Sequence, residues 1–134
     1  MLTRRGFTAC ALCAVAGFVA EGVAGPGAAT TGVTRTILNQ TDGPVAGYVI
    51  VEVRAEIEPG ATVARHIHPG VESAYIIDGT LDLSVDGEKT RTVGPGESSQ
   101  IPAYRPHSAK AHDTKVVIAA TYVIEKGKPL AIPA

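Results

Sequence analysis

The stretch GATVARHIHPGVE, residues 60–72, is the most informative part of this 134-residue chain. If it forms a strand, His66 and His68 point to the same face, because side chains two positions apart share a face of a β-strand. A Pro-Gly pair follows and predicts a chain reversal, after which Glu72 can return its carboxylate to the same place. The pattern therefore predicts two imidazoles and one carboxylate at one point, which is typical of a metal site.

A separate segment supplies a fourth candidate ligand, His107. The chain has only four histidines, so three of them fall in the proposed group. A lone histidine of this kind is more often a polar residue on an exposed strand face, and Glu72 alone would be read as a solvated acid. Three histidines and an acid at matching intervals favour one shared ion instead. Imidazole and carboxylate suit Fe, Mn, Co, Ni, Cu and Zn alike, so we expect one divalent transition metal of undetermined identity.

Alternating apolar residues around this stretch predict β-strands. Between Tyr48 and Ile57 every second residue is apolar, which is the pattern of a strand with one buried face. Asp86-Gly87 separates two short runs and predicts a tight hairpin. Further strands are expected at 34–38, 63–68, 72–77, 81–85, 89–93, 98–101, 107–111 and 115–124, with a loop at 39–44. Short strands separated by frequent turns predict an all-β sandwich or closed barrel.

The spacing of these residues resembles the sequence motifs of the cupin superfamily. The first motif is complete, as Gly60, five residues, His66, one residue, His68, three residues, Glu72, six residues and Gly79. The second is partly present, as Gly96, five residues, Pro102 and then His107. The resemblance covers roughly residues 48–125. It implies a single-domain jelly-roll β-barrel, also called a double-stranded β-helix, with His66, His68, Glu72 and His107 as ligands of a metal near the barrel mouth.

Two positions depart from the family pattern. The family commonly has Gly two residues after the motif's Pro, where this chain has Tyr104, and its terminal Asn is here Ala111. Gly serves where φ is positive, which Tyr tolerates poorly, so either this turn takes another form or Tyr104 is strained. Tyr104 and Arg105 are also candidates for the substrate mouth, where Arg105 would bind a carboxylate, although a surface turn is the commoner role for such a pair.

Residues 1–24 are predicted to be an export signal. Arg4 and Arg5 precede an apolar stretch from Phe7 to Ala20, and small residues follow at a plausible cleavage region. The start resembles the twin-arginine type, which carries folded proteins; an ordinary signal with two adjacent arginines is the alternative. The expected location is therefore the periplasm or the cell exterior.

The remaining chain is expected to comprise a flexible leader at 25–34, the barrel domain at 35–125 and a tail at 126–134 that covers the surface. Cys10 and Cys13 lie within the predicted signal, so we expect neither a disulfide nor a thiolate ligand in the mature chain. A net charge of −1 and 4% aromatic residues argue against a nucleic-acid partner. No apolar run is long enough for a permanent membrane anchor.

Three functions fit the resemblance. The leading expectation is a metal-dependent, dioxygenase-like oxidoreductase that acts on a small organic substrate, with Glu72 serving as ligand and as a base. The second is non-oxidative chemistry at the same site, by a decarboxylase, isomerase or lyase. The third is a metal or small-ligand binding module without turnover. Fold alone does not choose among them. The resemblance also implies pairing as a homodimer through edge strands.

Overall fold

The computed structural model describes residues 30–134. The predicted signal at residues 1–24, with Cys10 and Cys13, and the first part of the predicted leader lie outside the described residues. Within residues 30–134 the regular elements are β-strands, and this part of the chain has no helix long and apolar enough to cross a membrane. The prediction of an all-β fold is confirmed for the residues that the structure describes.

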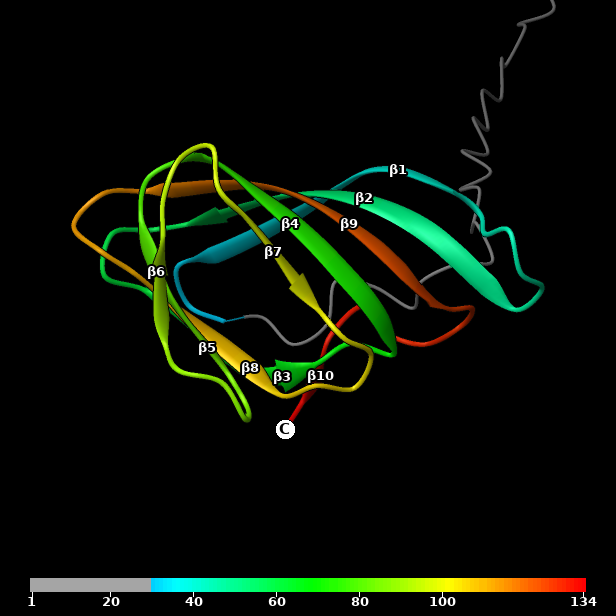
Figure 1. The fold of residues 1–134 in the computed structure, drawn as a ribbon. Coiled ribbons are helices and arrows are strands. Elements are labelled where there is room, and N and C mark those ends of the chain that lie inside the picture. Colours follow the sequence, from blue (N-terminus) through cyan, green and yellow to red (C-terminus); the bar gives the residue numbers. More distant parts are fainter. Residues whose placement is uncertain (1–29) are drawn as a thin grey trace, which may run out of the picture.

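Ten strands form two five-stranded antiparallel sheets that face each other (Figure 1). We call the first the outer sheet; in spatial order it contains β1 (Val33–Asp42), β2 (Tyr48–Ile57), β9 (Val116–Glu125), β4 (Gly70–Asp78) and β7 (Ser98–Ile101). We call the second the inner sheet; it contains β10 (Ile132–Pro133), β3 (Thr62–Ile67), β8 (His107–Ala111), β5 (Leu81–Val85) and β6 (Arg91–Val93).

The strand pairing is nested. β5 pairs with β6, β4 with β7, β3 with β8 and β2 with β9, so the chain forms one long hairpin rolled into a barrel. This is the jelly-roll arrangement that the sequence predicted. The rolling places β3 and β4, which are adjacent in sequence, in different sheets, so residues from the two ends of the motif stretch can meet between the sheets.

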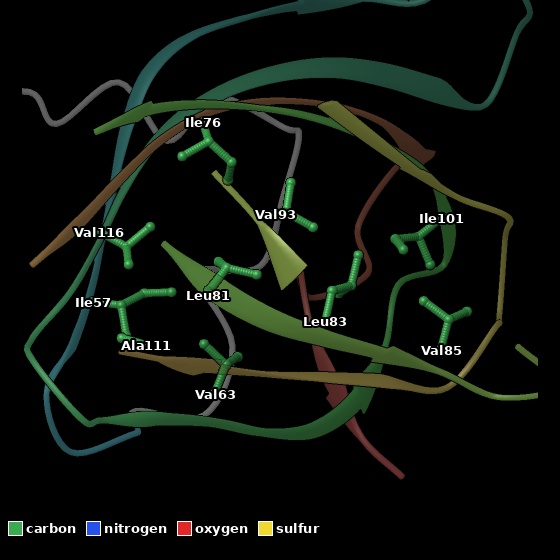
Figure 2. Close-up of a cluster of buried hydrophobic side chains, with 10 residues drawn as sticks. All are labelled: Ile57, Val63, Ile76, Leu81, Leu83, Val85, Val93, Ile101, Ala111 and Val116. Carbon is green, nitrogen blue, oxygen red and sulfur yellow. The ribbon is translucent and has the colours of Figure 1, made fainter. Parts of the chain in front are cut away.

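The period-two pattern of β2 produces the core. Val49, Val51, Val53, Ala55 and Ile57 are all buried, while the residues between them are exposed or half-buried. Figure 2 shows a cluster of apolar side chains that includes Ile57 and packs between the sheets; it is made of Ile57, Val63, Ile76, Leu81, Leu83, Val85, Val93, Ile101, Ala111 and Val116. Each fully buried Val, Leu or Ile stabilises the fold by roughly 1.5–3 kcal/mol.

The two ends of the described chain differ from expectation. β1 continues through the predicted loop to Asp42, because a bulge between Ile37 and Asn39 lets the strand keep its pairing with β2. The predicted surface tail is anchored instead: Leu130 is completely buried against the core, and β10 pairs with the end of β3. The C-terminal segment contacts the candidate site described next.

Candidate metal centre

His66 lies near the end of β3, where a bulge turns its side chain inward. Val63 and His66 are both buried although they are three positions apart, which a regular strand would not allow. The pairing of β3 with β8 shifts between these two residues. The irregularity also brings the carbonyl oxygen of Ala64 to 2.7 Å from Nδ1 of His66, which donates a hydrogen bond to it.

His107 is the first residue of β8 and the direct cross-strand partner of His66. Such partners hold their side chains side by side, and the two ring centroids are 4.2 Å apart. Nδ1 of His107 donates a hydrogen bond to the carbonyl oxygen of Arg105 at 2.9 Å. The register of the two strands therefore brings together histidines from the two separate motif segments.

His68 follows β3 and is 2% exposed. Its Nδ1 donates a hydrogen bond to the carbonyl oxygen of Leu130 at 2.5 Å. Its Nε2 lies 3.2 Å from Nε2 of His66. His68 is thus held from behind by the C-terminal segment while its other nitrogen faces the remaining histidines.

Glu72 approaches the histidines from the outer sheet. It lies on β4 opposite Tyr122 of β9, whose hydroxyl donates a hydrogen bond to Oε1 of Glu72 at 3.0 Å. The other carboxylate oxygen, Oε2, lies 3.0 Å from Nε2 of His68 and 3.3 Å from Nε2 of His107. The structure thus brings all four predicted ligands, His66, His68, His107 and Glu72, to one place between the two sheets.

The donor set fits one metal ion. A carbonyl oxygen only accepts hydrogen bonds, so Nδ1 of each of the three histidines carries a proton, and the lone pairs on Nε2 remain free. The candidate ligand atoms of the histidines all lie within 4.8 Å of one another. Ligands about 2.0–2.1 Å from a shared ion are separated by roughly 2.9–3.4 Å, and the measured separations of 3.0, 3.2 and 3.3 Å fall in that range. Three histidines that can bind one metal ion are therefore present.

The protonation states also suit a cation. Burial, with the nearby His107, lowers the pKa of His66 to about 4, so this imidazole is neutral at neutral pH. Burial alone would raise the pKa of Glu72, but its close contacts with His107 and His68 outweigh the effect of burial and hold that pKa well below its usual range. A metal ion would meet neutral imidazole and a carboxylate already ionised.

A pocket opens from this group of side chains into the barrel. His66, Glu72, His107 and Tyr122 form one part of its wall. The rest is mainly apolar and comes from both sheets, including Ile57, Leu81, Leu83, Val93 and Ile118. The empty space, counted out to the solvent-open mouth, is about 620 Å³, which is within the range of small-molecule sites.

The two residues proposed for the substrate mouth do not line this pocket. Arg105 instead donates a hydrogen bond from its guanidinium to the carbonyl oxygen of Asp86 at 2.7 Å. Tyr104 is exposed, and its hydroxyl contacts Glu125, the last residue of β9, and Lys128 just after it. Of the two conformations considered for its turn, the strained one occurs: Tyr104 has a φ of 59°, in the left-handed region that favours glycine.

Sequence reasoning missed three polar residues of the pocket wall, Arg35, Ser99 and Tyr122. Tyr122 is 3% exposed and lies within the predicted last strand, where its position opposite Glu72 depends on strand register. Arg35 lies near the start of β1, opposite Ala55, and no pattern in the sequence distinguishes it from a solvent-facing strand residue.

Comparison with known proteins agrees with this architecture. The family model described as Cupin domain matches residues 53–125. A cupin superfamily protein from Desulfitobacterium hafniense is 16% identical with a TM-score of 0.60, over 73% of this chain and 83% of that one. The polyketide cyclase RemF from Streptomyces resistomycificus is 26% identical with a TM-score of 0.59, over 78% and 72% of the two chains. The DMSP lyase DddQ from Ruegeria pomeroyi is 19% identical with a TM-score of 0.63, over 76% and 51%.

No curated protein matches the sequence significantly. The family model covers more than half of the chain, and it includes all four residues that converge between the sheets. The fold is similar to that of the solved cupin superfamily protein, with a TM-score of 0.60. The chain therefore belongs to the cupin family, as a jelly-roll domain with a three-histidine group that can hold a metal ion.

Proposed function

We propose that this cupin is a metal-dependent oxidoreductase that brings dioxygen and a small organic substrate to one divalent transition metal ion. The observation that carries the proposal is the convergence of three histidines, whose ligand atoms lie within 4.8 Å of one another, with Oε2 of Glu72, which lies 3.0 Å from His68 and 3.3 Å from His107, at the wall of a largely apolar pocket. Four protein ligands would leave two positions open on a six-coordinate metal. A bound ion would act as a Lewis acid and as a template for both reactants.

The protein groups have separate tasks. The three histidines keep their Nε2 lone pairs aimed at the ion because main-chain carbonyls hold their Nδ1 protons. Tyr122 fixes Oε1 of Glu72 and leaves Oε2 facing the histidines. Glu72, ionised at neutral pH, is therefore the group that can accept a proton from a bound substrate. The apolar wall suits dioxygen and an apolar substrate body, and it limits access of water.

A second candidate is non-oxidative turnover at the same site. The pairing of Glu72 with Tyr122 provides a proton acceptor and a neighbouring hydroxyl without any oxidant. The polyketide cyclase that this chain resembles at 26% identity supports this candidate. A Mn(II)-loaded sample that converts an organic acid without net consumption of O2 would favour it.

The test is to load the purified protein separately with Fe(II), Mn(II), Ni(II), Cu(II), Co(II) and Zn(II). Oxygen uptake is then followed with phenolic and diketone substrates, and products are identified by mass spectrometry. The proposal expects uptake with at least one redox-active metal, none with Zn(II), and loss of uptake in Glu72→Gln, which cannot accept the proton. If no metal supports uptake or conversion but small molecules still bind, the chain is a binding module and the proposal is wrong.

A further inference from the structure

Arg35 differs from the other arginines of the described chain in lacking a protein partner. Residues 30–134 contain five arginines. Arg54 pairs with Glu56, and Arg65 pairs with Asp86. Arg91 and Arg105 each donate a hydrogen bond to a main-chain carbonyl oxygen. Within the described residues, Arg35 forms neither an ion pair nor a side-chain hydrogen bond. The hydrogen-bond donors of this half-buried guanidinium are therefore free to bind a ligand.

The backbone directs Arg35 toward the pocket. It is the cross-strand partner of Ala55, which is buried and lines the pocket. Val33, two positions earlier on the same face, also lines the pocket, whereas Thr34 between them is exposed. Arg35 also borders a second, smaller hollow that it shares with His66, so it stands at the rim next to the candidate metal centre.

The charge of Arg35 reaches both sides of the site. Arg35 lines the same pocket as His66 of the inner sheet and Tyr122 of the outer sheet. Among the pocket-lining side chains, the one carboxylate is Glu72, which is already held by Tyr122 and the histidines. A pocket with a free guanidinium at its rim and a divalent cation inside would carry a net positive charge. It would therefore attract an anion.

We infer that Arg35 binds the carboxylate of the substrate, and that the substrate is a small organic acid with an apolar body. The guanidinium matches a carboxylate with two parallel hydrogen bonds. The apolar wall, with Ile57, Leu83 and Ile118, receives the body of the molecule. This inference rests on the proposed function for its substrate, but it concerns binding and is testable without turnover. Arg35 thus takes the role that the sequence had suggested for Arg105.

The experiment measures binding of benzoate and of its neutral counterpart benzamide to the Zn(II)-loaded protein by titration calorimetry. The unmodified protein should bind benzoate at least tenfold more tightly than benzamide. Arg35→Met keeps the length and apolar stem of the side chain but removes the charge. It should weaken benzoate binding by roughly 10- to 100-fold and leave benzamide binding within a factor of about two. Arg35→Lys should restore part of the preference, because it keeps the charge but not the planar pair of donors.

Arg54→Met is the matched control. Arg54 lies on the neighbouring strand with its side chain on the outer face, so this variant removes the same charge without touching the pocket. It should retain the benzoate preference. If Arg35→Met keeps both its zinc and the full preference, benzoate binds the metal directly and the inference is overturned. A protein that binds benzoate through Arg35 yet consumes no O2 with any metal would instead contradict the proposed oxidoreductase function and leave this inference intact.

Discussion

Nδ1 of His68 lies 2.5 Å from the carbonyl oxygen of Leu130, although the two residues are 62 positions apart. Leu130 is fully buried and belongs to the core cluster around β2 and β9. The contact therefore joins a metal-site ring to a packed anchor in the last residues of the chain. It makes the C-terminal segment part of the site, and not only a cover over the barrel.

Truncation after Pro129 tests this connection. The shortened chain loses both the buried side chain of Leu130 and the carbonyl that holds His68. We expect the free energy of unfolding to fall by about 2–5 kcal/mol, because a buried apolar anchor is removed. We also expect zinc affinity to fall by about 10- to 100-fold, because the ring loses the group that orients it. Urea unfolding and competition with a zinc-binding dye measure the two effects.

Leu130→Ala separates packing from orientation. It removes most of the side chain but keeps the carbonyl oxygen, so it should lose a similar amount of stability and much less zinc affinity. Truncation after Ala131 removes β10 alone and should affect both quantities only slightly. Equal loss of zinc affinity in Leu130→Ala and in the chain ending at Pro129 would show that the carbonyl has no special role.

Tyr104 provides a test of backbone strain. Its φ of 59° costs a residue with a side chain about 1–2 kcal/mol, and its ring gains contacts with Glu125 and Lys128. Tyr104→Gly and Tyr104→Ala both lose those contacts. The two variants therefore differ mainly in the energetic cost of the positive φ, which is lower for glycine than for alanine. We expect the glycine variant to be about 1 kcal/mol more stable than the alanine variant in thermal or urea unfolding. Equal stability would mean that the turn relaxes once the ring is gone.

The metal centre is tested by replacing His66 and His68 together with alanine. Removing two of three imidazoles should reduce bound metal from one ion per chain to an undetectable level after dialysis, measured by elemental analysis. His112→Ala is the control, because His112 is exposed and contacts Asp82 away from the pocket. Full metal content in the double variant would exclude the proposed ligands.

Gly70 and Gly60 allow two reasons for a glycine to be compared: lack of space for a side chain at Gly70, and a positive φ at Gly60. A side chain at Gly70 would overlap the main chain of Val123 and Ile124, whereas a side chain at Gly60 meets open space despite a φ of 71°. Gly60→Ala should therefore destabilise the protein by only about 1–2 kcal/mol. Gly70→Ala forces β4 away from β9, so we expect a larger loss of stability, together with loss of metal, in the same unfolding and metal-content measurements.

Much of the barrel could be predicted because its strands carry their burial pattern locally. The alternation from Tyr48 to Ile57 and the run from His107 to Ala111 match β2 and β8 in the structure. The cupin resemblance of the first motif added the order in which the strands pair. The chain ends could not be predicted in this way. Leu130 lies in a short segment that has no periodic pattern of apolar residues, and its burial depends on contacts with distant strands.

The polar residues of the pocket show a similar limit. His66 and His107 are cross-strand partners, and spacing within a known motif was enough to propose them together. Arg35 looks like any charged residue on an edge strand, since only its pairing with Ala55 reveals which face it occupies. Arg105 was a candidate for binding a substrate carboxylate, but its turn directs the guanidinium to the carbonyl oxygen of Asp86. The direction of a side chain in a turn of this kind depends on the path of the backbone, which the sequence motif does not specify.

The acceptors behind the three imidazoles belong to Ala64, Arg105 and Leu130, and all three are main-chain oxygens. No exchange of one amino acid for another deletes such an atom. Side-chain changes at these positions therefore leave the acceptors in place, although Leu130 must remain apolar because it is buried in the core. A survey that substitutes one residue at a time would rank them as unimportant for coordination, and only changes to the path of the backbone would expose what they do.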